Sequence, residues 1–139
     1  MSIKALCVPP ADIRRTWQAV SYMIVSALEN GDGMTDYAVL ECNLFDGHNQ
    51  LWLAVDDERD NDILAAAVTT LGIANGRKIC TIIACGGREM ARWMKVIETI
   101  EAFAIREGCA SVAIYGRRGW ARALDGYREI ASVMEKRLN

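Results

Sequence analysis

The spacing of apolar side chains in the first third of the chain is typical of helices. Apolar residues recur every three or four positions from Ile13 to Leu28, which predicts an amphipathic helix that ends at Asn30-Gly31. A second, shorter helix is expected to begin at Thr35, because threonine is a favoured N-cap residue, and to end at Gly47. A strand from Ile3 to Val8 is expected before both helices.

The apolar period changes from helical to strand-like near residue 50. Three strands are predicted, over residues 50–55, 63–71 and 78–84. The last two are joined by Asn75-Gly76, a pair that accepts positive φ at both positions and favours a two-residue hairpin. The first two are joined by the acidic segment Asp56 to Asp62, which lacks the ligand spacing of a calcium loop and is expected to be a solvated turn. The three strands are therefore expected to be antiparallel.

A crossover unit follows these strands. The chain passes from the 78–84 strand through Gly86 and Gly87 into an amphipathic helix that runs from Arg88 to about Glu107. A strand from Ser111 to Tyr115 comes directly after that helix. Because strand–helix–strand connections are right-handed and bring their two strands together in parallel, the 78–84 and 111–115 strands should be parallel neighbours.

The expected fold is a single α/β domain, of the α+β type, over residues 1–139. A mixed sheet of three antiparallel strands and the parallel strand–helix–strand unit would have helices on both faces. Beyond this unit we expect a short helix over residues 119–124 and a final strand from Glu129 to Lys136. The hydrophobic content of 52% is sufficient for one core in a chain of 139 residues.

Charge and cysteine usage narrow the classes of function. The formal net charge of −2 argues against a general nucleic-acid binder. None of the five cysteines forms a CxxC pair, so we expect free thiols in a reducing compartment and neither a disulfide framework nor a metal site. No segment reaches the ~20 apolar residues of a membrane span. A soluble cytoplasmic protein without a membrane partner is therefore expected.

Gly86 and Gly87 admit two interpretations. A strand that ends in glycines and leads into a helix leaves backbone N–H groups unpaired, so this turn could bind an anion with the help of Arg88. Alternatively, the glycines serve only a tight strand-to-helix connection with positive φ. Cys85, at the same point, is either a thiol activated by the helix N-terminus or a buried one.

The order of the elements resembles the GNAT fold, that of the GCN5-related N-acetyltransferases. The best local matches are CGGREMARWM at residues 85–94, EAFAIREGCASVAIYGRRG at 101–119 and GWARALDGYREI at 119–130. The chain also resembles small GNAT-like proteins encoded by tailed phages. The resemblance implies that acetyl-CoA binds where the 78–84 and 111–115 strands separate, without a metal. The residues expected to bind this cofactor are Ala84, Cys85, Gly86, Gly87, Arg88, Arg117, Arg118 and Arg122.

Two positions depart from the pattern of the family. The family binds the CoA pyrophosphate with a Q/R-x-x-G-x-G/A loop, and no register of the segment from Cys85 to Met90 supplies both glycines. The frequent catalytic tyrosine of the family corresponds to Arg122, counted back from Tyr127, and arginine cannot donate a proton at neutral pH. Tyr115 is then the candidate catalytic proton donor.

Four arginines stand out in the C-terminal quarter of the chain, with Trp120 among them. They are Arg117, Arg118, Arg122 and Arg128. The group could bind CoA phosphates, a nucleic-acid backbone or acidic protein side chains, or it could form a solvated helix face. Arginine and tryptophan together are typical of an interface hot spot, so a protein partner is expected at Arg118, Trp120, Arg122 and Arg128. This partner would be another copy of the chain or a phage structural protein.

The sequence therefore supports two functions. Because the acyl-CoA loop is degenerate, the favoured one is a non-catalytic phage-type protein that acts in virion assembly or host interaction, in the host cytoplasm or in the virion. The alternative is an active acetyl-CoA-dependent N-acyltransferase with an unknown amine or protein acceptor. In that case catalysis would depend mainly on positioning, and a backbone N–H near Ala84 or Cys85 would polarise the thioester.

Overall fold

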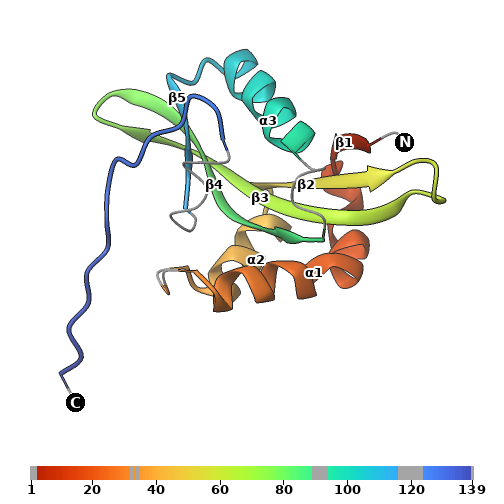
Figure 1. Ribbon diagram of the computed structural model, residues 1–139, viewed down its shortest axis with the longest axis horizontal. Helices are drawn as coiled ribbons and strands as arrows, with labels where there is room; N and C mark the ends of the chain where they lie inside the picture. The colour runs from red at the N-terminus through yellow and green to blue at the C-terminus, as the bar shows by residue number, and fades with distance from the viewer. Residues whose placement is uncertain (1–2, 32, 34, 89–93, 116–123, 139) are drawn as a thin grey trace.

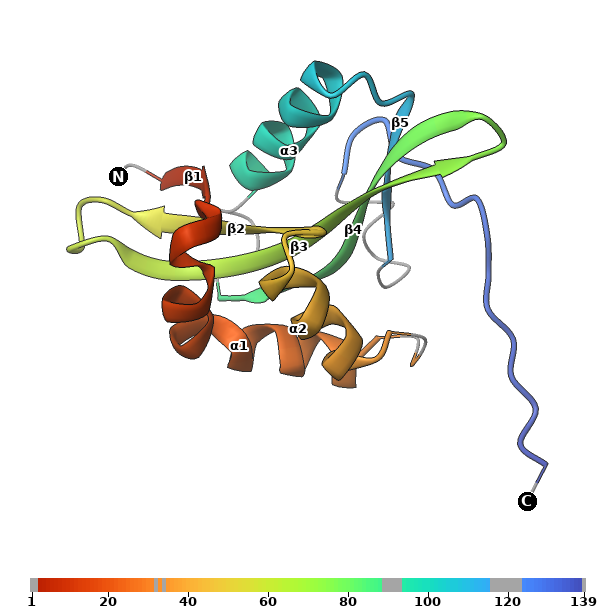
Figure 2. The same ribbon diagram turned by 180° about the vertical axis from the view of Figure 1, so that it is seen from behind.

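The computed structural model is a five-stranded sheet with helices on both faces (Figure 1). It describes residues 3–31, 33, 35–88, 94–115 and 124–138. The elements are β1 (Ile3–Cys7), the 3₁₀ turn η1 (Pro10–Asp12), α1 (Ile13–Glu29), α2 (Tyr37–Phe45), β2 (Asn49–Asp56), β3 (Asp62–Ala74), β4 (Arg77–Gly87), α3 (Met94–Arg106) and β5 (Ser111–Ile114). α1 and α2 cover one face of the sheet and α3 covers the other (Figures 1 and 2).

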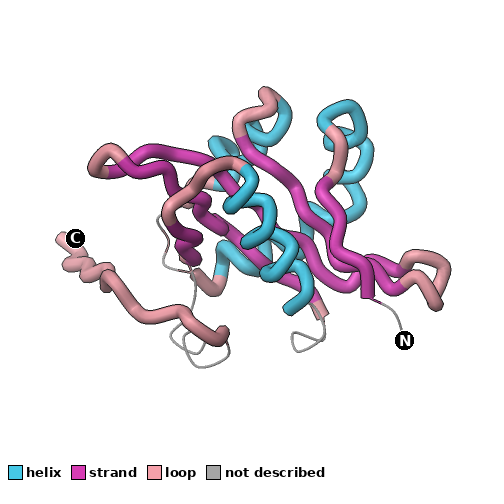
Figure 3. The backbone as a smooth tube through the Cα atoms, turned by 90° about the horizontal axis from the view of Figure 1, so that it is seen from above, coloured by secondary structure: helices cyan, strands magenta, loops and turns pink. Residues whose placement is uncertain are grey.

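The strand order β1-β2-β3-β4-β5 follows the sequence. β1 to β4 pair antiparallel, whereas β5 pairs with β4 in parallel from Ile79 opposite Ser111 to Ile82 opposite Ile114. Seen from above, the strands form one twisted layer with the helices against it (Figure 3). The predicted antiparallel trio and the parallel crossover are both confirmed. Asn75-Gly76, with φ of 54° and 73°, forms the predicted hairpin turn.

Each face of the sheet has its own apolar core. In β2 the odd-numbered residues from 51 to 55 pack against α1 and α2, while Trp52 and Ala54 pack on the side of α3. This alternation is the two-residue period of a strand that is buried on both faces. Trp52 contacts the ring of Phe103 edge-to-face, with ring centroids 5.2 Å apart, and its indole N–H donates to Thr69 Oγ1 at 2.9 Å. The expectation that Trp52 is a core residue is confirmed.

The carboxylate of Glu41 joins α1 to α2. Its Oε2 atom accepts hydrogen bonds from the indole N–H of Trp17, at 2.8 Å, and from the hydroxyl of Tyr37, at 2.9 Å. The two rings stack with centroids 6.1 Å apart. Because Trp17 lies on α1 and the other two residues lie on α2, this cluster ties the two helices together.

Two predicted helix boundaries are wrong. The N-cap of α2 is Asp36 and not Thr35, because the Asp36 carboxylate accepts a hydrogen bond from the backbone N–H of Ala38 at 2.8 Å. The helix expected from Arg88 does not begin there, since Arg88 lies in a bend after β4. α3 is described from Met94, and residues 89–93 lie outside the described part of the chain.

The acidic turn between β2 and β3 is solvated only in part. Asp56 is fully buried at the end of β2. Its carboxylate accepts a hydrogen bond from the N–H of Glu58 at 3.0 Å and lies 3.7 Å from the guanidinium of Arg59. Asp56 therefore stabilises the turn through its side chain. Its role could not be predicted from the sequence, because the neighbouring residues are also acidic.

The C-terminal segment is not the predicted strand. Residues 128–138 have no strand pairing, and they lead away from the sheet after passing β5 (Figures 1 and 2). Leu124 and Tyr127 anchor the root of this segment: Leu124 is buried in the core beneath α3, and the Tyr127 hydroxyl donates to Glu101 Oε2 at 2.7 Å. The short helix predicted over residues 119–124 lies outside the described residues except for Leu124.

Candidate functional site

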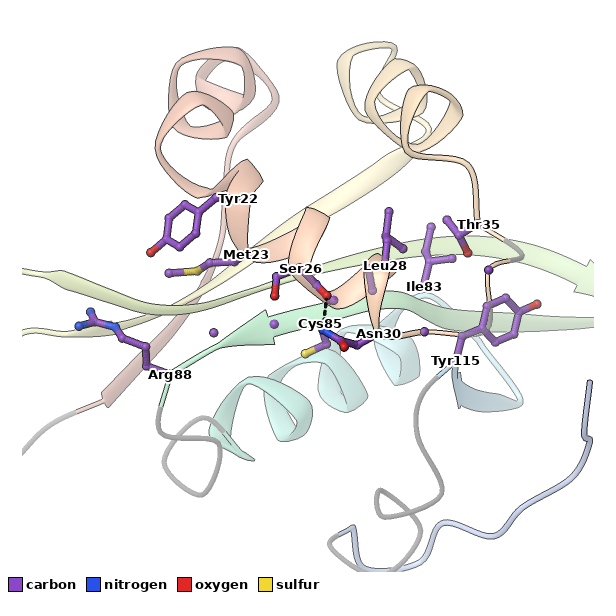
Figure 4. A pocket seen from close by; sticks show the side chains of 16 residues that line it. Tyr22, Met23, Ser26, Leu28, Asn30, Thr35, Ile83, Cys85, Arg88 and Tyr115 are labelled. Carbon is purple, nitrogen blue, oxygen red and sulfur yellow. Dashed lines mark hydrogen bonds between the residues drawn. The ribbon is translucent and has the colours of Figure 1, made fainter.

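A cleft of ≈ 420 Å³ lies between α1 and the second half of β4 (Figure 4). Its lining residues are Tyr22, Met23, Ser26, Ala27, Leu28, Asn30, Gly31, Gly33, Thr35, Ile83, Ala84, Cys85, Gly86, Gly87, Arg88 and Tyr115. Arg88 and Tyr115 lie toward opposite ends of the cleft (Figure 4). The structure thus brings together the predicted site residues from Ala84 to Arg88 with Tyr115.

β4 has a β-bulge at Ile83, in the floor of the cleft. Val68 of β3 is opposite Ala84 and Thr69 is opposite Ile82, so Ile83 has no partner of its own in the ladder. A bulge bends the strand and takes local peptide groups out of the regular hydrogen-bond pattern. Because Ile83 and Ala84 both line the cleft, this bulge lies in its floor.

β4 and β5 separate at the same point. Their last paired residues are Ile82 and Ile114, and the N–H of Tyr115 still donates to the Ile82 carbonyl at 3.0 Å. β4 continues beyond Ile82 to Gly87, paired with β3 alone among the described strands. The edge of β4 from Ile83 onward is therefore without a strand partner on the side of β5 in the described part of the chain.

Gly86 and Gly87 are the last two residues of β4. The prediction that they form a turn between the strand and the next helix is therefore wrong. They are paired with Ala66 and Ala65 of β3. A Cβ atom on Gly86 would overlap the carbonyl oxygen of Met23, so glycine is what lets α1 approach β4 this closely. Gly87 has a φ of 149°, and a side chain there would overlap the backbone of β3. Close packing explains both glycines without any ligand.

Arg88 is held in place where β4 ends. Its Nη2 atom donates to the Asp62 carboxylate at 2.9 Å and to the Ile63 carbonyl at 3.2 Å. Its backbone N–H donates to the Leu64 carbonyl at 2.7 Å, so this amide is not one of the unpaired groups that the sequence predicted. The side chain is 58% exposed. Since a guanidinium has five N–H donors, Arg88 can still bind an anion at the mouth of the cleft.

Cys85 is a partly buried thiol and not an activated one. Its side chain packs with the core beneath α3. Burial raises the pKa of Cys85 well above its ordinary value. The thiol therefore stays protonated at neutral pH, and of the two interpretations made from the sequence the buried one is correct.

The wall formed by α1 supplies polar groups that the sequence analysis did not single out. Tyr22, Ser26 and Asn30 follow one another at four-residue intervals, so they lie on one face of the helix. The Asn30 side-chain amide donates to the Ser26 carbonyl at 2.9 Å (Figure 4). Thr35 joins them from the loop before α2. The spacing was visible in the sequence, but nothing there showed which face of α1 would border a cleft.

Charge in the cleft is sparse. Among the described residues that line it, Arg88 alone is charged. Of the predicted arginine group, Arg117, Arg118 and Arg122 lie outside the described residues together with Trp120, while Arg128 is exposed in the C-terminal segment.

Within the described part of the chain, no three His, Cys, Asp or Glu side chains are placed to hold a metal ion. No helix formed by the described residues is long and apolar enough to cross a membrane.

The fold is that of known acetyltransferases. An aminoglycoside acetyltransferase from an uncultured soil metagenomic sample, solved in complex with sisomicin, matches with a TM-score of 0.69 and 13% identity over 99% of this chain and 97% of that one. A GNAT family acetyltransferase from Staphylococcus aureus matches with a TM-score of 0.65 and 17% identity over 99% and 100%. A ribosomal-protein-alanine N-acetyltransferase from Brucella melitensis matches with a TM-score of 0.66 and 10% identity over 97% and 99%.

The class of fold is a mixed α/β sheet in which a parallel crossover leads to β5, the last described strand. The chain has the GNAT fold, as its sequence predicts. No protein-family model matches the sequence, and no curated protein matches it either. At 10 to 17% identity the similarity establishes the fold alone, so the function has to be argued from the cleft itself.

Proposed function

We propose that the protein is an acetyl-CoA-dependent N-acyltransferase that uses the cleft between α1 and β4. The observation that carries the proposal is the separation of β4 from β5 after Ile82, at the Ile83 bulge and in the floor of the cleft. The pantetheine arm of CoA is an extended chain with two amides, and such a chain can pair with an exposed strand edge as an added strand does. The edge of β4 beyond Ile82 offers this pairing.

The side chains and peptide groups of the cleft fit the chemistry of acyl transfer. The amine nitrogen of the acceptor attacks the thioester carbonyl carbon, the carbon–sulfur bond breaks, and the amine loses a proton while the departing sulfur gains one. A backbone N–H near Ala84 or Cys85 donates to the carbonyl oxygen as negative charge develops on it. The Tyr115 hydroxyl donates the proton to the sulfur. Arg88, at the other end of the cleft, binds a phosphate of CoA.

The lining of the cleft restricts the acceptor. The neighbour solved with sisomicin binds an aminoglycoside, which is a polycation, and a polycation needs carboxylates around it. The described lining of this cleft contains no carboxylate and has the cationic Arg88 at one end. The proposed acceptor is therefore a small amine without further positive charges, held by the hydroxyl and amide groups of Tyr22, Ser26 and Asn30.

Acetyl-CoA binding tests the proposal directly by calorimetry on the purified chain. Ser26→Trp places a large ring in the cleft from an exposed helix position and should abolish the binding heat. Glu29→Trp is the matched control, because Glu29 is exposed on the same helix but does not line the cleft. In a thermal scan, acetyl-CoA at 100 times its Kd should stabilise the parent and the control by about 2.7 kcal/mol.

The same titration decides between this proposal and the other function that the sequence suggested. The three neighbours named above are acetyltransferases, and none of them is described as a phage protein. If millimolar acetyl-CoA produces neither binding heat nor a shift in Tm, the acyltransferase proposal is overturned. A non-catalytic role in phage assembly or host interaction would then be the better account of a retained fold with an altered CoA loop. If it binds, mass spectrometry of a panel of small amines identifies the acetylated acceptor.

A further inference from the structure

The cleft between α1 and β4 has apolar side chains in its lining that the proposed reaction does not use. Leu28 of α1 and Ile83 of β4 both line the cleft, and each is only partly buried. Both also pack against the core on the α1 and α2 side of the sheet, so the fold holds them in place. Apolar surface in a cleft that also has a few polar groups is typical of a place where a ligand buries an apolar group.

The close contact at Gly86 limits where such a group can lie. The carbonyl oxygen of Met23 and the Cβ atom of Ala27 occupy the space beside Gly86, so an apolar chain has no room between α1 and β4 at that point. Leu28 is the next residue of α1 after Ala27, and Ile83 precedes Gly86 in β4. An apolar part of a ligand therefore has to lie on the Leu28 and Ile83 side of this contact.

The direction of an acyl-CoA in the cleft decides which part of it meets these two side chains. In the proposed function, Arg88 binds a phosphate at one end and Tyr115 protonates the sulfur at the other. Leu28 and Ile83 lie on the Tyr115 side of Cys85, away from Arg88 (Figure 4). In an acyl-CoA the acyl group follows the sulfur, so it would lie at the Tyr115 end, next to Leu28 and Ile83.

We propose that Leu28 and Ile83 bind the acyl chain of the donor, and that the chain preferred is a neutral one longer than acetyl, such as butyryl. This inference rests on the proposed function, because it assigns a part of the same cleft. Each methylene that is buried against apolar side chains increases affinity about fourfold, whereas acetyl has only its methyl group to bury. A carboxylate at the end of the chain would be desolvated at Leu28 and Ile83 and is therefore disfavoured.

Calorimetry on the full chain without an acceptor tests the preference, with acetyl-CoA, butyryl-CoA and malonyl-CoA as the ligands. Butyryl-CoA should bind about 15-fold more tightly than acetyl-CoA, since it adds two methylenes. Malonyl-CoA, which ends in a carboxylate, should show no such gain. Leu28→Asn should remove most of the gain for butyryl-CoA and leave the Kd for acetyl-CoA nearly unchanged. Val25→Asn is the matched control, because Val25 is on the same helix but does not line the cleft.

Ile83→Thr tests the same contact from the strand, because threonine keeps the β-branched shape but replaces an apolar group by a hydroxyl. A thermal scan checks that each variant is folded. If acetyl-CoA and butyryl-CoA bind the parent equally well, this inference is overturned and the proposed function stands. If Leu28→Asn and Ile83→Thr both keep the gain for butyryl-CoA, the acyl chain lies elsewhere and the inference is also overturned. If none of the three thioesters binds, the proposed function fails and this inference fails with it.

Discussion

The carbonyl oxygen of Met23 on α1 occupies the space where a side chain on Gly86 of β4 would begin. The backbones of α1 and β4 are therefore in direct contact along one side of the cleft. A side chain on Gly86 would also touch Ala27, one turn further along α1. The separation of α1 from β4, which sets the shape of the cleft, depends on the absence of one Cβ atom.

Gly86→Ala tests this contact. Forcing a methyl group into well-packed backbone should lower the free energy of unfolding by about 1–3 kcal/mol, measured by urea denaturation. Gly72→Ala is the control, since Gly72 also lies in a strand but has open space around its Cα and no positive φ. That variant should be unchanged or slightly more stable. Equal stability of the two variants would contradict the packing described here.

The Glu41 cluster gives a second prediction about stability. Glu41→Ala leaves the indole N–H of Trp17 and the hydroxyl of Tyr37 without their acceptor, and each lost partner should cost about 1–3 kcal/mol. Glu41→Gln keeps one carbonyl oxygen and should lose less. The measurement is urea unfolding followed by tryptophan fluorescence. If alanine and glutamine behave alike, the carboxylate is not what joins α1 to α2.

The hydrogen bond from Tyr127 to Glu101 predicts how stability depends on pH. Burial, the hydrogen bond to Glu101 and the charge of Glu101 together raise the pKa of Tyr127. Burial also raises the pKa of the Cys80 thiol to about 11. Because the folded protein holds these protons more tightly than the unfolded chain, the stabilisation is complete below the unfolded pKa values and is lost as the pH rises toward the folded ones.

The free energy of unfolding should therefore begin to fall as the pH rises past about 8.5, the ordinary pKa of a cysteine thiol, and should fall more steeply past about 10, that of tyrosine. In Tyr127→Phe this fall should be smaller, because the phenol no longer titrates. Tyr22→Phe is the control for the tyrosine-to-phenylalanine change itself, since Tyr22 is 63% exposed. Urea denaturation between neutral pH and the alkaline limit of reversible unfolding gives the slopes. A Tyr127→Phe curve parallel to that of the parent would refute the linkage.

Tyr115→Phe separates catalysis from binding. If the Tyr115 hydroxyl donates the proton to the leaving sulfur, its removal should lower kcat by about 10²-fold or more while the Kd for acetyl-CoA stays the same. The backbone contact of Tyr115 with Ile82 involves only its N–H and is kept in the variant. Tyr22→Phe, at the other side of the cleft, should affect the KM for the acceptor and not the proton transfer. An unchanged kcat in Tyr115→Phe would exclude Tyr115 as the donor.

The periodicity of the sequence was enough to predict the order of the helices and strands from β1 to β5 and the parallel pairing of β4 with β5, but not the absence of a strand at residues 129–136. Side-chain alternation in strands and four-residue spacing in helices are local properties, and Asn75-Gly76 defines its hairpin through backbone preferences of its own two residues. The set of residues from Ala84 to Arg88 with Tyr115 was also predictable, because the carboxyl ends of two neighbouring parallel strands meet at one place in a sheet.

Other features depended on contacts between segments that are far apart in the sequence. Gly86 is required by Met23, more than sixty positions earlier, so the pair Gly86-Gly87 looked like a turn until α1 was packed against β4. Tyr22, Ser26 and Asn30 form one wall of the cleft only because that face of α1 lies over the bulge in β4. The apolar residues after Tyr127 have the composition of a strand, but a strand needs a neighbour to pair with, and residues 128–138 have no strand pairing in the tertiary structure.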